Sequence, residues 1–333
     1  MENNKIDFVI TWVDGNDPKW IEEKNKYTEE KKGEANSKIR YRDWGLLKYW
    51  FRGIEKNAPW VNKVYFITYG HVPQWLNTNY EKIKIIKHED YIPKEYLPTF
   101  SSNVIELFIN RIEGLSKNFV YFNDDMFLLD KFYPNDFFEN NYPKDELILN
   151  AVSVREDNNI IEHIILNNLE ILSKYFKKEN VIKENKSKIY NLKYGKKAIK
   201  SILLKEWKYF TGIENPHVAI AYNKETWDML WEKEGQNLYK TAESKFRSKY
   251  DYNHWIFRYY QLLSGNFIPK SFKGYYYYDL MENNDKFLKN LKEHKYKMVC
   301  INDSNENINF EKVKDELQET FNSILNEKSK FEK

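Results

Sequence analysis

The sequence predicts an α/β fold with a mostly parallel sheet and a helical elaboration. The first observation is a set of short runs rich in Val, Ile, Phe and Tyr, each bounded by polar or turn residues. Four such runs occupy residues 6–12, 63–68, 83–87 and 119–122. The second observation is helical periodicity between these runs, at 46–55 and 104–112. Strands that alternate with helices favour a parallel sheet.

The second half of the chain is more helical and less regular. Helices are expected at residues 164–176, 227–231, 255–263 and 310–325. The Lys/Asn-rich stretch 177–200 is expected to be an exposed insertion or a mobile loop. No internal repeat or Pro/Gly linker divides the chain, so we expect one catalytic domain over residues 1–333. Within it, residues 153–210 are expected to form a helical, Lys/Asn-rich insertion.

Composition limits the classes of function. The 333 residues are 41% hydrophobic and carry a net charge of only +3, so we expect no nucleic-acid partner. The single cysteine, Cys300, excludes an internal disulfide and argues against a cysteine-based zinc site. No signal peptide and no run of ~20 apolar residues is visible. We therefore expect a cytoplasmic location, with peripheral contact on the inner face of the plasma membrane left open.

The strongest local signal is Asn123-Asp124-Asp125, which directly follows the predicted strand at 119–122. In open α/β sheets the ligand crevice lies at the carboxyl ends of the strands. Two adjacent carboxylates there suit Mg²⁺, which takes one or two carboxylates and leaves its other positions to substrate phosphates. The same three residues are good turn formers, and spacing alone does not decide between a metal site and a turn.

Another group of candidate residues follows the first predicted strand. Gly15 permits close approach of a ligand to the backbone, and Asp14 could hold a ribose hydroxyl or a base edge. Trp12 could stack on a ring of the ligand. A strand that ends in an Asp-Gly turn, with Trp12 in the core, is the simpler alternative.

Further candidates are spread along the chain and are weak individually. Arg42 precedes the helix at 46–55, where an arginine can help to cradle a phosphate. Arg247 could clamp a phosphate, and His217 titrates near neutral pH, as a general acid or base does. Asn302-Asp303 again places Asn-Asp after an apolar run. Surface charge, a structural histidine or a turn would explain each of them equally well.

A loop at residues 97–103 is expected to lead into the helix at 104–112, and Ser102 or Asn103 is expected to cap that helix.

The sequence motifs of several other enzyme classes are missing. There is no P-loop, G-x-G-x-x-G, H-E-x-x-H or G-x-S-x-G motif. Kinase, Rossmann dehydrogenase, zinc protease and α/β-hydrolase hypotheses therefore lack support.

Taken together, four blocks of sequence resemble the Stealth family. That family comprises bacterial capsule phosphotransferases and the animal N-acetylglucosamine-1-phosphotransferase α/β subunit. The first block is IDFVITWVDG at 6–15, and the third holds His217 and Phe246-Arg247-Ser248. The second block is assembled from residues 40–43, 54–61, 72–76, 97–100 and 121–127. The fourth holds Ile301-Asn302-Asp303 and closes near Ser329, Phe331 and Glu332. The segment between residues 130 and 217 departs from the family's pattern, which leaves the acceptor in doubt.

The resemblance implies a fold like that of nucleotide-sugar transferases, of the GT-A-like, Rossmann type. It implies transfer of hexose-1-phosphate or N-acetylhexosamine-1-phosphate from a UDP-sugar donor to a glycan hydroxyl, with release of UMP. The product would be a phosphodiester in a capsular or other cell-surface polysaccharide. The acceptor would be an oligosaccharide or a lipid-linked glycan, and the cofactor would be Mg²⁺ or Mn²⁺.

The resemblance also implies roles for the candidate residues around the cation. Asp124 or Asp125, together with Asp303, would hold the metal against the diphosphate. Asn123 and Asn302 would orient oxygens.

The remaining candidates would act on the donor and the acceptor. Arg247, with Arg42, would neutralise charge on the phosphoryl oxygens. His217 would be the general base, with an aspartate as the alternative. The uridine or ribose pocket would be lined by the residues that follow the first strand: Trp12, Asp14 and Gly15.

Two other functions stay open at this point. A conventional glycosyltransferase on a similar fold would release UDP instead of UMP. A non-catalytic glycan-binding protein is also conceivable, because 10 Trp, 26 Tyr and 21 Phe offer many surfaces for sugar stacking. Such a protein would tolerate the loss of Asp124, Asp125 and Asp303. Nothing in the sequence specifies the oligomeric state.

Overall fold

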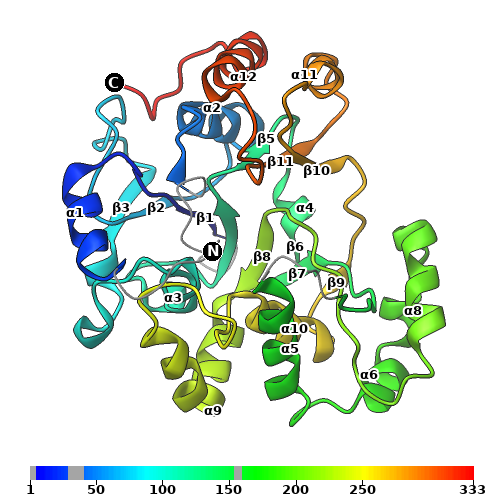
Figure 1. Cartoon of the computed structure of the whole chain (residues 1–333). Coiled ribbons are helices and arrows are strands. Elements are labelled where there is room, and N and C mark those ends of the chain that lie inside the picture. The colour runs from blue at the N-terminus through cyan, green and yellow to red at the C-terminus, as the bar shows by residue number, and fades with distance from the viewer. Residues whose placement is uncertain (1–4, 29–40, 154–159) are drawn as a thin grey trace.

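A five-stranded sheet with the strand order β3-β2-β1-β4-β8 lies at the centre of the molecule (Figure 1). The computed structural model describes residues 5–28, 41–153 and 160–333. The strands of this sheet are β1 (Ile6–Thr11), β2 (Val64–Thr68), β3 (Ile83–Lys87), β4 (Asn118–Asn123) and β8 (Ile220–Asn223). The first four are parallel, and β8 is an antiparallel edge strand. The predicted α/β fold with a mostly parallel sheet is confirmed.

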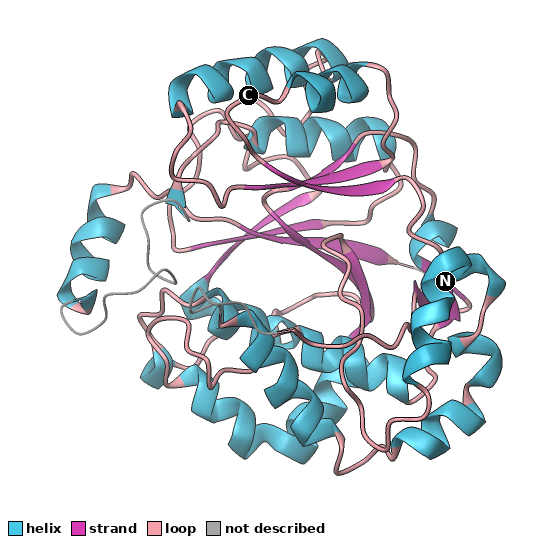
Figure 2. Ribbon diagram, turned by 45° about the vertical axis from the view of Figure 1, so that its right-hand side comes forward, coloured by secondary structure: helices cyan, strands magenta, loops and turns pink. Residues whose placement is uncertain are grey.

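Helices cover both faces of the strands (Figure 2). Those above the sheet in Figure 1 are α2 (Leu47–Asn57), α11 (Asp285–Lys292) and α12 (Phe310–Ile324). Those below it are α3 (Ser102–Leu107), α5 (Ile161–Leu172), α9 (Lys224–Ala242) and α10 (Trp255–Leu263), while α1 (Pro18–Lys26) lies at one side. Because both faces are covered, β1, β2 and β4 are buried along almost their whole length, as their continuous apolar runs require.

Two smaller sheets extend the central one. The first has the order β10-β11-β5 and consists of β10 (Tyr275–Asp279), β11 (Met298–Asn302) and β5 (Met126–Leu128). The second joins β6 (Phe138–Glu139), β7 (Tyr142–Asp145) and β9 (Ile268–Pro269), with the short helix α4 (Pro134–Phe137) before it. Strand β5 starts directly after β4 and pairs antiparallel with β11. The end of β11 is thereby brought to the end of β4.

The structure confirms the four predicted strands and the helices expected at 46–55, 255–263 and 310–325. The helix expected at 104–112 is shorter, because α3 ends at Leu107 and a 3₁₀ turn follows. Neither Ser102 nor Asn103 caps it: Ser101 is the N-cap residue, and Ser102 is the first residue of the helix.

Of the two alternatives for residues 177–200, the mobile loop is wrong, and the exposed insertion stays a prediction. This stretch contains α6 (Lys178–Glu184), α7 (Lys186–Ile189), a 3₁₀ helix and the start of α8 (Ala198–Leu204). Val181, Ile189 and Tyr194 are buried and fix it to the body of the protein, although lysines dominate its composition. Residues 154–159 of the expected insertion at 153–210 lie outside the described residues, and the single-domain assignment stays a prediction. No helix in the described part of the chain has the length and apolar content that crossing a bilayer demands.

Candidate active site

Three of the predicted groups of residues meet at one edge of the central sheet. Thr11, the last residue of β1, pairs with Asn123, the last residue of β4. The backbone N–H of Ile301 in β11 donates to the carbonyl of Asp125 at 2.9 Å. The residues after β1, the Asp124-Asp125 pair and Asn302-Asp303 therefore share the carboxyl edge, where open α/β sheets hold their ligands.

The acidic pair forms the turn between β4 and β5. Burial raises the pKa of Asp125 to about 6, although the hydrogen bond with the Cys300 thiol and the charge of Arg247 act to lower it. Asp124 is accessible to solvent, yet the protein around it and the charge of Asp125 raise its pKa to about 7. The two carboxylates of this pair are therefore held where ionising both is unfavourable.

The pair offers the donors that a divalent cation takes. The Oδ1 atom of Asp125 is buried and has no hydrogen-bond partner among the described residues, which is uncommon for a carboxylate oxygen. The described residues contain no group of three or more His, Cys, Asp or Glu side chains arranged to hold a metal. Mg²⁺ fits two carboxylates, because it takes its remaining ligands from water and substrate phosphates.

Asp303 is paired with Arg42 in a forked ion pair. Arg42 Nε donates to Asp303 Oδ2 at 2.8 Å, and Arg42 Nη2 donates to Oδ1. Trp44 Nε1 also donates to Oδ2, at 3.2 Å. Arg42 further donates to the carbonyl of Asn305 at 2.9 Å. In this structure Arg42 and Asp303 thus satisfy each other and hold the loop after β11.

Arg247 is held at the site by Ser102, whose Oγ accepts from Arg247 Nε at 2.9 Å. Ser102 also hydrogen-bonds the buried carboxyl group of Glu106. Burial raises the pKa of Glu106 to about 7, although the charge of Arg247 opposes the shift. Because Arg247 also lowers the pKa of Asp125, its charge acts on both acids.

His217 lies beside β10, the strand that neighbours β11. Its exposed ring is 4.6 Å from the ring of Tyr277, which pairs with Cys300 across β10 and β11. The hydroxyl of Tyr277 donates to Asp279 at 2.9 Å, and the side chain of Asn302 donates to the same Asp279 oxygen. The surrounding protein lowers the pKa of His217, and Asp279 opposes this effect. The direction of this shift favours the neutral ring, which is the form that can accept a proton.

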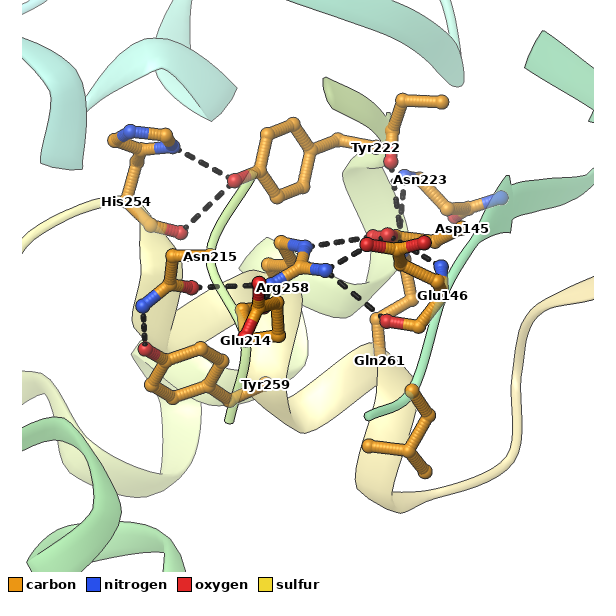
Figure 3. A network of polar contacts seen from close by, with 12 residues as sticks. Asp145, Glu146, Glu214, Asn215, Tyr222, Asn223, His254, Arg258, Tyr259 and Gln261 are labelled. Carbon is orange, nitrogen blue, oxygen red and sulfur yellow. Dashed lines mark hydrogen bonds and ion pairs between the residues drawn. The ribbon is translucent and has the colours of Figure 1, made fainter. Parts of the chain in front are cut away.

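A buried ionic network supports the His217 loop (Figure 3). Arg258 is completely buried and makes a forked pair with Asp145, with Nε to Oδ2 at 2.7 Å and Nη2 to Oδ1 at 2.8 Å. Its third nitrogen donates to the Glu214 carbonyl at 2.9 Å and to Asn215 Oδ1 at 3.0 Å. Arg258 thereby fixes the backbone directly before His217.

The same network carries a second histidine. Tyr222 contacts His254 Nδ1 at 2.7 Å and donates to its carbonyl at 3.2 Å (Figure 3). Burial and the charge of Arg258 lower the pKa of His254 to about 3. The other ring nitrogen of His254 is 4.0 Å from Glu106 Oε2, so the network continues to the acid that orders Ser102 and Arg247.

The residues after β1 have mainly packing partners. Trp12 stacks on Phe66, with ring centroids 5.6 Å apart, and meets His71 edge-on at 5.2 Å. The backbone N–H of Asp14 donates to His71 Nε2 at 2.8 Å. A Cβ on Gly15 would lie 2.1 Å from the Tyr41 carbonyl oxygen, so close backbone contact requires glycine there. The uridine-pocket roles of Trp12, Asp14 and Gly15 stay predictions.

Sequence analysis missed Glu106, His254 and Tyr277. Glu106 sits in an apolar helix, and its only signal was a charge within that run. His254 and Tyr277 gave none.

A separate hollow of about 940 Å³ lies at the amino ends of the strands, where Lys5 and Lys63 precede β1 and β2. Because the groups that could carry chemistry gather at the opposite edge, this hollow is not the candidate active site.

Adjacent aspartates at the carboxyl edge of an α/β sheet, with the charge of an arginine nearby, suit an enzyme that transfers phosphate-containing groups. The chain belongs to the Stealth family. Conserved region 1 of the Stealth proteins matches residues 4–32, and conserved region 2 matches residues 40–145.

Relatives match along almost the entire chain. The capsular polysaccharide phosphotransferase WcwK of Streptococcus pneumoniae is 46% identical, over 99% of this chain and 98% of that protein. The exopolysaccharide phosphotransferase cps2G of Lactiplantibacillus plantarum is 39% identical, over 98% and 96%. The receptor polysaccharide phosphotransferase WefC of Streptococcus oralis is 39% identical, over 99% of both. Among solved structures, the bifunctional glycosyltransferase WbbM matches 96% of this chain and 50% of that chain, with 12% identity and a TM-score of 0.40.

Proposed function

We propose that this protein transfers a hexose-1-phosphate or N-acetylhexosamine-1-phosphate from a UDP-sugar to a glycan hydroxyl, with release of UMP, in surface polysaccharide synthesis. Family membership supports phosphotransfer in capsule or exopolysaccharide synthesis, since full-length relatives are named for it. The observation that carries the finer proposal is the Asp124-Asp125 pair, with an unpartnered buried oxygen and Arg247 close by. The negative charge of a diphosphate must be compensated by positive charge, and the Asp124-Asp125 pair can bind the cation that supplies it.

Asp124 and Asp125 are the residues that would hold Mg²⁺ or Mn²⁺. When bound there, the cation neutralises negative charge on the diphosphate oxygens. Asn123, the last residue of β4, is adjacent and would orient an oxygen of the donor. Asp303 would join the set only if Arg42 released it, because its two oxygens already accept from Arg42 and Trp44.

The protein's own side chains would position the phosphoryl group and compensate its negative charge. Arg247, fixed by Ser102, would donate its remaining N–H groups to the oxygens of the transferred phosphoryl group. A new bond forms between the acceptor oxygen and phosphorus, and the bond from that phosphorus to the UMP oxygen breaks. The bond between the sugar carbon and its oxygen is untouched, so the anomeric configuration is kept.

His217 would take the proton of the attacking hydroxyl. Its lowered pKa keeps the ring neutral near pH 7, and its exposed edge is open to an acceptor. General-base catalysis of this kind contributes roughly 10²–10⁴-fold in rate. Glu106 is buried behind Ser102 and Arg247, so we assign it a positioning role instead of contact with the substrate. The proposal places the reaction in the cytoplasm, on an oligosaccharide or lipid-linked acceptor.

The identity of the released nucleotide tests the proposal. Purified protein is incubated with Mg²⁺, a panel of UDP-sugars and a glycan extract, and the nucleotides are separated by chromatography. UMP release that requires both acceptor and metal supports hexose-1-phosphate transfer. UDP release would instead assign the chain to conventional glycosyl transfer.

A further inference from the structure

One segment of the molecule turns apolar side chains toward solvent. Residues 192–209 run from a 3₁₀ helix through α8, which lies at the periphery of Figure 1, on the opposite side from α1. We call these residues the α8 segment. Its exposed large apolar side chains are Leu192, Ile199, Ile202, Leu203, Trp207 and Tyr209. Leu192 is 96% exposed, and Leu203 is 66% exposed. Exposure of six large apolar side chains within one segment of 18 residues is typical of a surface that binds a partner or a membrane.

The outward orientation of these side chains is fixed by the structure. Ser201 is buried, and its Oγ accepts from the backbone N–H of Leu149 at 2.9 Å. Tyr194 is also buried, and its hydroxyl accepts from the N–H of Leu147 at 3.2 Å. Lys178 donates to the carbonyl of Trp207 at 2.6 Å. The small and polar side of the α8 segment thus packs inward, while its apolar side faces out.

Exposed lysines alternate with these apolar residues along the α8 segment. The α8 segment contains six lysines and one glutamate, a net charge of +5, whereas the whole chain carries +3 and the remainder therefore −2. Lys197 and Lys200 pair with acidic groups of the body. Lys193, Lys196 and Lys208 form no ion pair with any residue in the described ranges. The positive charge of the protein is concentrated where its apolar side chains are exposed.

We propose that the α8 segment docks on an anionic lipid bilayer and holds the protein at the membrane surface. Exposed apolar side chains that include Trp and Tyr, interspersed with exposed lysines, match the interface of an acidic bilayer. A protein partner fits less well, because protein interfaces are enriched in arginine and depleted in lysine, whereas the α8 segment has six lysines and no arginine. Long lysine side chains can lay their stems on the apolar surface and direct their charges to lipid headgroups.

The location of this segment also matters for the reaction, although this step rests on the proposed function. Seven residues separate Tyr209 from His217, which makes eight steps from one Cα atom to the next. At no more than ~3.6 Å per residue they span at most ~29 Å. The backbone between them is fixed by strand-like bonds from Asn150 and Val152 to Gly212 and Thr211. With Tyr209 at the bilayer, His217 would therefore lie within ~29 Å of the surface that carries a lipid-linked glycan.

Vesicle flotation of the full chain tests the docking surface without requiring turnover. The vesicles are phosphatidylcholine, with or without phosphatidylglycerol. We expect the protein to float with phosphatidylglycerol vesicles, to float less as salt increases, and to stay behind with phosphatidylcholine alone. The variant Ile202→Glu/Leu203→Glu and the variant Lys196→Glu/Lys208→Glu should each reduce the vesicle-bound fraction about tenfold.

Matched controls place the same changes elsewhere. Leu166→Glu changes an exposed residue of α5, and Lys286→Glu/Lys292→Glu changes exposed lysines of α11, so both should bind as the wild type does. Absence of flotation at low salt, or equal flotation of all variants, would overturn the proposal. So would a concentration-dependent dimer that Ile202→Glu/Leu203→Glu abolishes without any lipid binding, because the face would then belong to a second copy. Nucleotide release measured on the same variants with a water-soluble acceptor keeps failure of docking separate from failure of catalysis.

Discussion

The carboxyl group of Glu106 on α3 accepts a hydrogen bond of 3.1 Å from the hydroxyl of Tyr121 on β4. Tyr121 in turn meets Thr11 of β1 at 3.0 Å, and Ser102 connects Glu106 with Arg247. Two central strands and one helix are thus joined behind the acidic pair. The direction in which Arg247 points is therefore set by buried groups, before any substrate arrives.

Replacement of Arg247 should remove the charge that faces the phosphoryl group. We expect Arg247→Ala to reduce kcat by at least about 10²-fold, and Arg247→Lys to restore little, because a lysine cannot reproduce the fork. Steady-state kinetics and thermal melts check this on folded protein. Arg111→Lys, an exposed arginine outside the site, is the control. Near-normal kcat in Arg247→Ala would exclude the role.

Removal of one charge from the acidic pair should separate catalysis from folding. Asp125→Asn keeps the size of the side chain but weakens any cation site, so we expect turnover to fall by more than about 10²-fold. Because the buried carboxylate is unfavourable in the absence of a cation, the melting temperature without metal should stay the same or rise. Asp130→Asn, on the exposed end of the same region, should leave both quantities unchanged.

Removal of the cation by chelation is a second test of the Asp124-Asp125 site. Excess EDTA should abolish wild-type turnover, and Mg²⁺ or Mn²⁺ should restore it. The stabilisation of the protein by added Mg²⁺ and UDP-sugar should be smaller in Asp125→Asn than in the wild type. Equal stabilisation in both proteins would contradict cation binding by the pair.

The pH dependence of the reaction should report the base. Because the folded protein lowers the pKa of His217, the ring loses its proton at a pH below the ordinary value of 6.5. The acid limb of kcat/KM should accordingly fall below pH 6.5, with activity constant above it. His217→Ala should remove that limb and most of the rate. An unchanged limb in this variant would transfer the role to a carboxyl group.

Arg258 and Asp145 should control stability more than chemistry. Arg258→Met leaves the buried carboxylate of Asp145 without its partner, so we expect unfolding to become easier by about 3–5 kcal/mol. The double variant Arg258→Met/Asp145→Leu should recover much of this loss, because neither charge then remains buried. Urea unfolding measures both, and Lys205→Met, in an exposed pair with Glu206, should change stability by less than about 1 kcal/mol. Full stability of Arg258→Met would contradict the supporting role.

The parts of the fold that could be predicted are those whose signals are local in sequence. β1, β2 and β4 are continuous apolar runs, and the acidic pair follows β4 directly, so its place at the carboxyl edge followed from strand order alone. The pairing of β11 with β5 could not be predicted, because nothing in either segment specifies so distant a partner. That pairing is what brings Asp303 to the site.

The burial of charged side chains was the other property that could not be predicted from the sequence. Glu106 and Arg258 are charged residues in helices, and composition assigns such residues to solvent. Their burial depends on Tyr121 and Asp145, which lie on other elements. The stretch 177–200 shows the same effect in reverse, since three buried side chains order a segment that its lysines mark as a loop.

The most direct test follows the phosphorus of the donor into the product. The wild-type protein is given Mg²⁺, the active UDP-sugar and acceptor glycan, and the purified glycan is examined by ³¹P nuclear magnetic resonance. Hexose-1-phosphate transfer predicts a phosphodiester signal in the glycan, with one UMP formed for each phosphodiester and neither product made by Asp125→Asn. A glycan that gains sugar but no phosphorus, with UDP as the released nucleotide, would contradict it.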